Sequence, residues 1–181
     1  MKEIFTTVDI EAPAEVVWDV LVDFERYPVW NPRTRITGTA AAGERLVVAP
    51  GPEADGMPTF RPRVLRADGT ELRWLGHLYV RGLFDGEHVF TVEDLGNGRS
   101  RLVQTESFGG ILARPLLWLY GDDTRAGFEA VNEALKDRAE ALVESGSESE
   151  SGSADPAGGD SPGGAVEGGR RRAEATVDTT T

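Results

Sequence analysis

Six strand-like segments follow one another between residues 33 and 108, and helical patterns occur only before and after that block. The segments are bounded by turn residues and cover 33–40, 44–49, 59–67, 70–79, 87–95 and 100–108. Parallel strands need long crossover connections, usually helices, whereas antiparallel strands can be joined by tight turns. Strands and helices in separate blocks therefore predict an α+β fold with an antiparallel sheet.

Residues 2–10 are β-branched and alternate in polarity, which predicts one more strand ahead of the block. A short helix is predicted next, with Pro13 near its first turn, where a missing N–H costs little. Its apolar stripe consists of Val16, Val17, Val20 and Leu21. A second short helical turn over residues 24–27 is expected to stop at Pro28.

A long helical pattern closes the folded part and runs from about Pro115 to Val143. Its apolar side comprises Leu116, Leu119, Phe128, Val131, Leu135, Ala139 and Leu142. Gly121 indicates either a kink or a later helix start, with Asp122 or Asp123 as the N-cap. These aspartates are not expected to hold a metal, because no further ligand cluster is apparent.

A curved sheet of about seven strands is too wide for a single long helix to fill. Residues 1–143 are therefore expected to form one domain with an internal apolar cavity between sheet and helix. The Pro-rich segment 50–58 and the segment 80–86 are predicted to act as lids. Such a cavity suits a hydrophobic or amphipathic small molecule.

The composition changes sharply after Val143. The run 144–169 consists of Gly, Ser, Pro, Ala and acidic residues, with Val166 as its only large apolar residue. Such a segment cannot bury enough surface to offset its chain entropy, so residues 144–181 are predicted to be a disordered acidic tail. Arg170–Arg172 form either a small docking patch or an ordinary run of charge.

The chain has a formal net charge of −12, with 31 acidic and 19 basic residues. A surface of that sign repels phosphate backbones and anionic lipid, so neither nucleic acid nor a membrane surface is an expected partner. Abundant carboxylates, few lysines and no cysteine are similar to the proteins of salt-loving archaea. An ordinary acidic bacterial protein is the alternative interpretation.

The absence of cysteine excludes disulfides, zinc–thiolate sites and cysteine nucleophiles. No apolar run is long enough for a membrane span, and the N-terminus has no signal-peptide pattern, so we expect a cytoplasmic protein, either monomer or dimer. No phosphate loop, dinucleotide glycine motif, HExxH motif or Ser-His-Asp spacing occurs. We therefore expect no cofactor and no metal.

Residues 11–21, EAPAEVVWDVL, and their continuation 23–32, DFERYPVWNP, resemble the opening of the START-like superfamily, also called SRPBCC. Residues 83–90 and 104–110 resemble one bacterial and archaeal branch of it. The superfamily includes polyketide cyclases, lipid-transfer domains, the birch pollen allergen and plant abscisic acid receptors. The resemblance covers residues 1–143 and implies a helix-grip fold, in which the sheet wraps on the C-terminal helix around a ligand cavity. Because this fold hosts binders, carriers and enzymes, it assigns no activity.

Strand alternation predicts which side chains face the interior. The tight turn at Asn97 pairs residues whose numbers sum to about 194, which places His88 nearly opposite Glu106 on the neighbouring strand. A connection near residues 82–84 brings the preceding strand alongside. The interior face around this pair is then predicted to include Trp74, Gly76, Phe90, Gln104 and Phe108.

The His88–Glu106 pair allows three interpretations. The two groups can transfer protons, they can orient the polar end of a ligand together with Gln104, or they can form a buried structural pair. Trp30 is compatible with core packing or with the cavity mouth, and Asn31 is expected to be a turn or cap residue. The predicted ligand contacts are Trp30, Phe60, Trp74, Gly76, His88, Phe90, Gln104, Glu106, Phe108, Leu117, Tyr120 and Phe128.

These observations favour a binding protein for a lipid-like or polyketide-like molecule, acting as carrier or sensor rather than as an enzyme. A polyketide cyclase or dehydrase that uses His88 and Glu106 as acid and base is the second hypothesis. A third is an interaction module whose cavity is filled and whose surface binds a partner protein. Replacing His88 with alanine and Glu106 with glutamine is expected to abolish turnover in an enzyme but only to weaken binding in a carrier.

Overall fold

The computed structural model describes residues 2–53, 58–77 and 80–151, and its elements follow the predicted order. The first part contains β1 (Lys2–Ile10), α1 (Ala14–Val22), the 3₁₀ turn η1 (Phe24–Arg26) and α2 (Tyr27–Trp30). The strands β2 (Thr34–Thr37), β3 (Val47–Pro50), β4 (Arg63–Ala67), β5 (Glu71–His77), β6 (Asp85–Gly96) and β7 (Arg99–Gly109) follow. The helix α3 (Ala113–Ser151) ends the described chain.

The strands form two antiparallel sheets, one of five strands in the order β1-β7-β6-β5-β4 and one of two strands, β2 and β3. Isolated backbone bridges join Arg45 to Arg63 and Val48 to Phe60, and they link the small sheet to the β4 edge of the large one. The seven predicted strands are therefore present, but their ladder is interrupted between β3 and β4. Pro62 lies in this connection and has no N–H to donate to a ladder.

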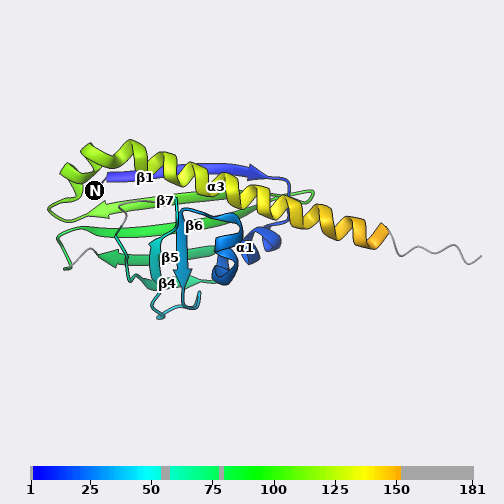
Figure 1. Ribbon diagram of the computed structural model, residues 1–181, viewed down its shortest axis with the longest axis horizontal. Coiled ribbons are helices and arrows are strands. Elements are labelled where there is room, and N and C mark those ends of the chain that lie inside the picture. The colour runs from blue at the N-terminus through cyan, green and yellow to red at the C-terminus, as the bar shows by residue number, and fades with distance from the viewer. Residues whose placement is uncertain (1, 54–57, 78–79, 152–181) are drawn as a thin grey trace, which may run out of the picture.

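The long helix α3 covers one face of the five-stranded sheet. It lies along β1 and β7 and continues past the sheet at its C-terminal end (Figure 1). Its residues Leu135 and Ala139 are fully buried, at 0% exposure, within the main apolar core. The predicted α+β helix-grip fold is thus confirmed, with two short helical elements between β1 and β2.

Gly121 is expected from the sequence to mark either a kink or a later start of the long helix, and the observed start of α3 excludes the second. The helix begins at Ala113 and is helical without a break through Gly121, so a later helix start with Asp122 or Asp123 as its N-cap is wrong. Glycine lowers helix stability by only about 1 kcal/mol, which the neighbouring turns of a long helix can offset.

The end of α3 also differs from the prediction. Composition predicts disorder from residue 144, whereas the helix continues to Ser151. The hydroxyls of Ser145 and Ser147 donate to the carbonyl groups of Leu142 and Glu144, so these serines bond back to the preceding helical turn. The rest of the predicted tail, including its arginine cluster, lies outside the described residues.

The structure describes only part of the first predicted lid, segment 50–58, and all of the second, segment 80–86. Residues 54–57 of the first lie outside the described residues, and its beginning belongs to β3. In the second, the Leu83 N–H donates to the Val80 carbonyl in a turn that leads into β6. Leu78 and Tyr79, at the predicted end of the preceding strand, lie outside the described residues.

Two tight turns join neighbouring strands of the large sheet, and each hairpin contains one register shift, between Val64 and Arg66 and between Asp94 and Gly96. At the first, backbone N–H groups of Glu71 and Thr70, together with the Arg66 side chain, hold the pKa of the Asp68 carboxyl well below its usual range. At the second, Asn97 has a φ of 56° between two glycines that also have positive φ. This second turn joins β6 to β7.

Tyr27 is buried under the small helices, and its hydroxyl donates to the Leu21 carbonyl at 2.7 Å. Burial raises the pKa of Tyr27 far above its usual range. The folded protein therefore keeps this proton at pH values where the unfolded chain loses it, above about pH 10. The stability that Tyr27 contributes is fully present below that pH and is lost as the pH rises beyond it.

Replacing Tyr27 with phenylalanine is expected to lower the free energy of unfolding by about 1 kcal/mol at neutral pH, because one hydrogen bond is lost. The difference should shrink by roughly 1.4 kcal/mol per pH unit above about pH 10, so the variant becomes the more stable protein near pH 11. Urea unfolding of both proteins across this range measures the difference. A difference that stays constant up to pH 11 would show that Tyr27 is not buried in this way.

Candidate ligand-binding site

A row of polar side chains crosses the interior between two apolar clusters. On β1, Val8 belongs to the larger cluster and Ile4 to the smaller one, and the buried Thr6 lies between them. On β7, Gln104 lies directly opposite Thr6 in the strand register. We call the following residues the polar row: Thr6, His88, Gln104, Glu106 and Asn132.

His88 of β6 lies within the polar row, between two of its other members. The side-chain N–H of Gln104 donates to His88 Nε2 over 2.9 Å, and His88 Nδ1 lies 3.4 Å from Glu106 Oε2. Because Nε2 accepts a hydrogen bond, the ring proton resides on Nδ1 and is directed toward Glu106. The strand register pairs His88 with Glu106, as predicted.

Aromatic rings surround the imidazole of His88. Phe90 stacks on it with a centroid distance of 4.5 Å and an interplanar angle of 26°. The rings of Trp74 and Phe128 each lie 5.1 Å away. Trp74 comes from β5 and Phe128 from α3, so His88 is held between the sheet and the helix.

The register of β5 against β6 confirms part of the predicted neighbourhood. Trp74 is paired with His88, while Phe90 is paired with Leu72. Gly76 is paired with Gly86 rather than with either aromatic residue. A Cβ added at Gly76 would lie 3.4 Å from the Pro62 side chain, so Pro62 covers this predicted ligand contact.

Glu106 has the most accessible side chain of the polar row. Its side chain is 19% exposed, compared with 10% for that of His88. A Cβ added at Gly86 would lie 2.9 Å from Glu106 Oε1, which shows that the carboxylate lies over this glycine. The absence of a side chain at position 86 therefore gives the carboxylate room beside the imidazole.

Asn132 extends the polar row from the sheet to α3. Its side-chain N–H donates to Thr6 Oγ1 over 2.9 Å. The side-chain oxygens of Asn132 and Gln104 are buried, and neither has a hydrogen-bond partner among the described residues.

The sequence did not predict Thr6 and Asn132 as members of the site. Both interrupt apolar patterns, since Thr6 lies in an inward alternation and Asn132 lies four residues after Phe128 on the apolar side of the helix.

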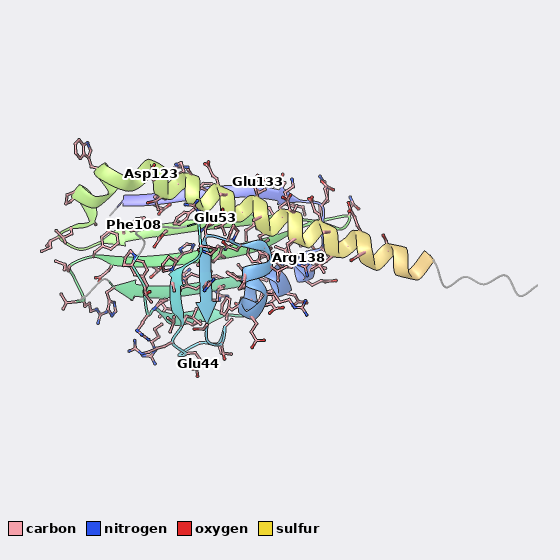
Figure 2. The ribbon with its side chains drawn as sticks, viewed as in Figure 1. Glu44, Glu53, Phe108, Asp123, Glu133 and Arg138 are labelled. Atoms are coloured by element: carbon pink, nitrogen blue, oxygen red, sulfur yellow. The ribbon has the colours of Figure 1, made fainter. Side chains whose placement is uncertain are left out.

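The other predicted contacts are only partly brought to this site. Phe108 packs on Phe84 in the smaller apolar cluster, and Figure 2 shows it at the same end of the molecule as Asp123. Phe60 is half-buried and bonds through its backbone to Val48 between the two sheets. The side chains of Leu117 and Tyr120 lie outside the described residues.

Trp30 is placed away from His88. It packs on Tyr27 with a centroid distance of 4.5 Å and lines a groove between α1 and α3. The neighbouring Asn31 accepts hydrogen bonds from the backbone of Arg33 and Thr34, which confirms its turn role. Short helices before β2 turn Trp30 toward the outer side of α1, which residue spacing does not reveal.

The groove between α1 and α3 has a volume of about 300 Å³. Figure 2 shows Arg138 on α3 beside α1, at this groove. Charged and apolar side chains alternate around it, and they are Val16, Asp19, Val20, Asp23, Arg26, Trp30, Arg138 and Leu142. None of the polar-row residues lines this groove.

Within the described parts of the chain, no group of three or more His, Asp or Glu side chains is arranged to hold a metal ion. In the same residues, every helix is too short or too polar to cross a membrane.

The closing helix, the antiparallel sheet and the small helices after β1 place the chain among the START-like (SRPBCC) proteins. Residues 1–144 match the family described as polyketide cyclase/dehydrase and lipid transport, and the chain belongs to that family. Comparison with curated protein sequences gave no match.

Solved structures share the fold at low sequence identity. An aromatase/cyclase from Streptomyces sp. R1128 is 18% identical, covers 78% of this chain and 95% of its own, and has a TM-score of 0.60. Norcoclaurine synthase from Thalictrum flavum, solved with dopamine and hydroxybenzaldehyde, is 13% identical over 79% of this chain and 87% of its own, with a TM-score of 0.59. A START superfamily protein from Mycobacterium smegmatis is 23% identical over 77% and 98%, with a TM-score of 0.57.

Proposed function

We propose that the protein binds a hydrophobic or amphipathic small molecule beside His88, between the sheet and α3, and acts as a carrier or sensor. The polar row carries this proposal. The fold itself does not require the row, because apolar side chains at these interior positions would avoid burying any polar group. A few polar groups converging in an apolar surrounding are typical of ligand pockets.

The family supports binding of this kind. Its description joins polyketide cyclase/dehydrase with lipid transport, and lipids are molecules with large apolar parts. Norcoclaurine synthase, which shares the fold, was solved with two small ring compounds. The partial exposure of Glu106 supports a route by which a ligand reaches the polar row.

The geometry favours ligand orientation over proton transfer by His88. Both imidazole nitrogens already face protein groups, Nε2 toward Gln104 and Nδ1 toward Glu106. A substrate would have to displace one of these groups before it could exchange a proton with the ring. An enzyme of the cyclase or dehydrase type, with His88 and Glu106 as acid and base, is the second candidate, and the accessible carboxylate of Glu106 favours it.

The groove between α1 and α3 is a weaker candidate for the ligand site, although its volume is about 300 Å³. Its lining includes Asp19, Asp23, Arg26 and Arg138, whose charges would be desolvated by an apolar ligand. None of the described side-chain atoms that are buried without a partner belongs to a residue of this groove. The polar row therefore has the stronger support.

Titration with the uncharged fluorescent probe N-phenyl-1-naphthylamine tests the proposal. We expect saturable one-to-one binding that is weakened about tenfold by His88→Ala, because the imidazole that stacks on Phe90 and holds the Gln104 and Glu106 side chains in place is lost. His77→Ala is the matched control, since His77 is exposed on β5, and its affinity should equal that of the native chain. Absence of saturable binding, or equal effects of the two substitutions, would contradict the proposal.

A further inference from the structure

The polar row has a pattern of paired nitrogens and unpaired oxygens. The side-chain nitrogen of Gln104 faces His88, that of Asn132 faces Thr6, and His88 Nδ1 faces Glu106. The amide oxygens of Gln104 and Asn132 face no partner among the described residues. The atoms of the row that are buried without any partner are therefore both acceptors, whereas each side-chain nitrogen of the row faces at least one protein group.

These two oxygens belong to deeply buried side chains. Gln104 and Asn132 are each 2% exposed. A buried acceptor without a donor loses the hydrogen bond that water gave it in the unfolded chain. Two such acceptors in one interior region of the protein indicate a place where a donor binds.

The two residues that carry these oxygens are both neighbours of Thr6. Thr6 is paired with Gln104 across β1 and β7, where opposite side chains are about 5 Å apart, and it is hydrogen-bonded to Asn132 at 2.9 Å. A ligand hydroxyl bound beside Thr6 would therefore be next to both residues that carry an unpaired oxygen. The rings of Phe90 and Phe128, beside His88, provide apolar surface for the rest of such a molecule.

We propose that the site selects a neutral molecule that presents a hydroxyl group from an apolar ring, and that this hydroxyl donates to Gln104 Oε1 or Asn132 Oδ1. The inference rests on the proposed binding function and names its ligand class. A ligand carbonyl or ether brings only another acceptor and leaves both oxygens unpaired. A carboxylate ligand would in addition be repelled by Glu106 and would lose its hydration.

Two probes of matched shape test this selection on the full chain by isothermal titration calorimetry at neutral pH. 2-Naphthol carries a hydroxyl donor, whereas 2-methoxynaphthalene keeps the ring and the oxygen but has no proton to donate. We expect 2-naphthol to bind about tenfold or more tightly than 2-methoxynaphthalene, the effect of pairing one buried acceptor.

Two variants test the named oxygens separately. Thr6→Val combined with Asn132→Leu removes an acceptor together with its partner, and Gln104→Leu removes the other acceptor. In at least one of these variants the affinities for 2-naphthol and 2-methoxynaphthalene should become nearly equal, while 2-methoxynaphthalene still binds. Thr105→Val is the control, because Thr105 lies next to Gln104 on the opposite face of β7, and it should keep the native preference.

The outcomes separate this inference from the proposed function. If neither probe binds the native chain, the proposed function fails. If both probes bind with equal affinity, the hydroxyl selection is overturned and the binding function stands. A preference for 2-naphthol that survives in both folded variants overturns the assignment to these two oxygens.

Discussion

Replacing Leu135 with alanine is expected to lower the free energy of unfolding by about 3 kcal/mol, among the largest effects of any single substitution in this chain. Leu135 is fully buried in the main core, at the point where α3 packs on the sheet. Alanine removes three carbon atoms and leaves a cavity that the surrounding strands fill only in part. The melting temperature should fall by roughly 6–12 °C in a thermal scan followed by circular dichroism.

Leu142→Ala is the matched control for this prediction. Leu142 lies on the same helix two turns further along but is 38% exposed at the groove beside α1. Its replacement should cost about 1 kcal/mol, clearly less than Leu135→Ala, because more than a third of Leu142 stays in water and its loss leaves no enclosed cavity. Equal losses for the two variants would contradict the described packing of α3 on the sheet.

Simultaneous replacement of His88, Gln104 and Glu106 with leucine is expected to have the opposite effect on stability. The three groups bond to one another, so their joint removal creates no new unpaired group among them. Well-packed apolar residues in place of a buried polar network are often neutral or stabilising. We expect the free energy of unfolding to stay the same or to rise by about 1–3 kcal/mol, while affinity for N-phenyl-1-naphthylamine falls at least about tenfold.

The single variant His88→Leu provides the contrast for this prediction. It leaves the Gln104 side-chain N–H and the Glu106 carboxylate without their partner and should therefore destabilise by about 1–3 kcal/mol. Urea unfolding measures both variants. A triple variant that is less stable than His88→Leu would favour the interpretation of the polar row as a purely structural network.

The short β6–β7 turn explains why part of the site could be predicted from sequence. Asn97 between two glycines forms a tight hairpin in which Gly96 pairs with Arg99, and a bulge between Asp94 and Gly96 then shifts the register of the following pairs by one residue. The opposition of His88 and Glu106 requires both the turn and this register shift, and strand alternation then directs Phe90 and Gln104 inward.

Contacts between elements distant in sequence could not be predicted in the same way. The Asn132–Thr6 bond depends on how α3 is rotated and shifted over β1, and no turn links those two elements directly. The polarity of both residues within apolar patterns was the available signal. The position of Trp30 likewise depends on how three short helical elements pack, which spacing along the chain does not determine.

Local interactions decided the remaining differences. The helix extends to Ser151, and the backbone of residues 144–151 is helical although a composition rich in Ser and Gly predicts otherwise. The break between β3 and β4 coincides with Pro62. The polarity pattern alone predicts that this residue belongs to a strand. In both cases backbone hydrogen bonding outweighed the average preference of the residues involved.

The most direct test of a ligand site beside His88 is ¹⁵N NMR of the imidazole groups during titration with N-phenyl-1-naphthylamine. The chain contains two histidines, the buried His88 and the exposed His77, so the control is within the same spectrum. Binding at the polar row should shift the His88 resonances until the probe saturates and leave those of His77 unchanged. His88 resonances that do not move at saturating probe, or that move no more than those of His77, would contradict a ligand site at the polar row.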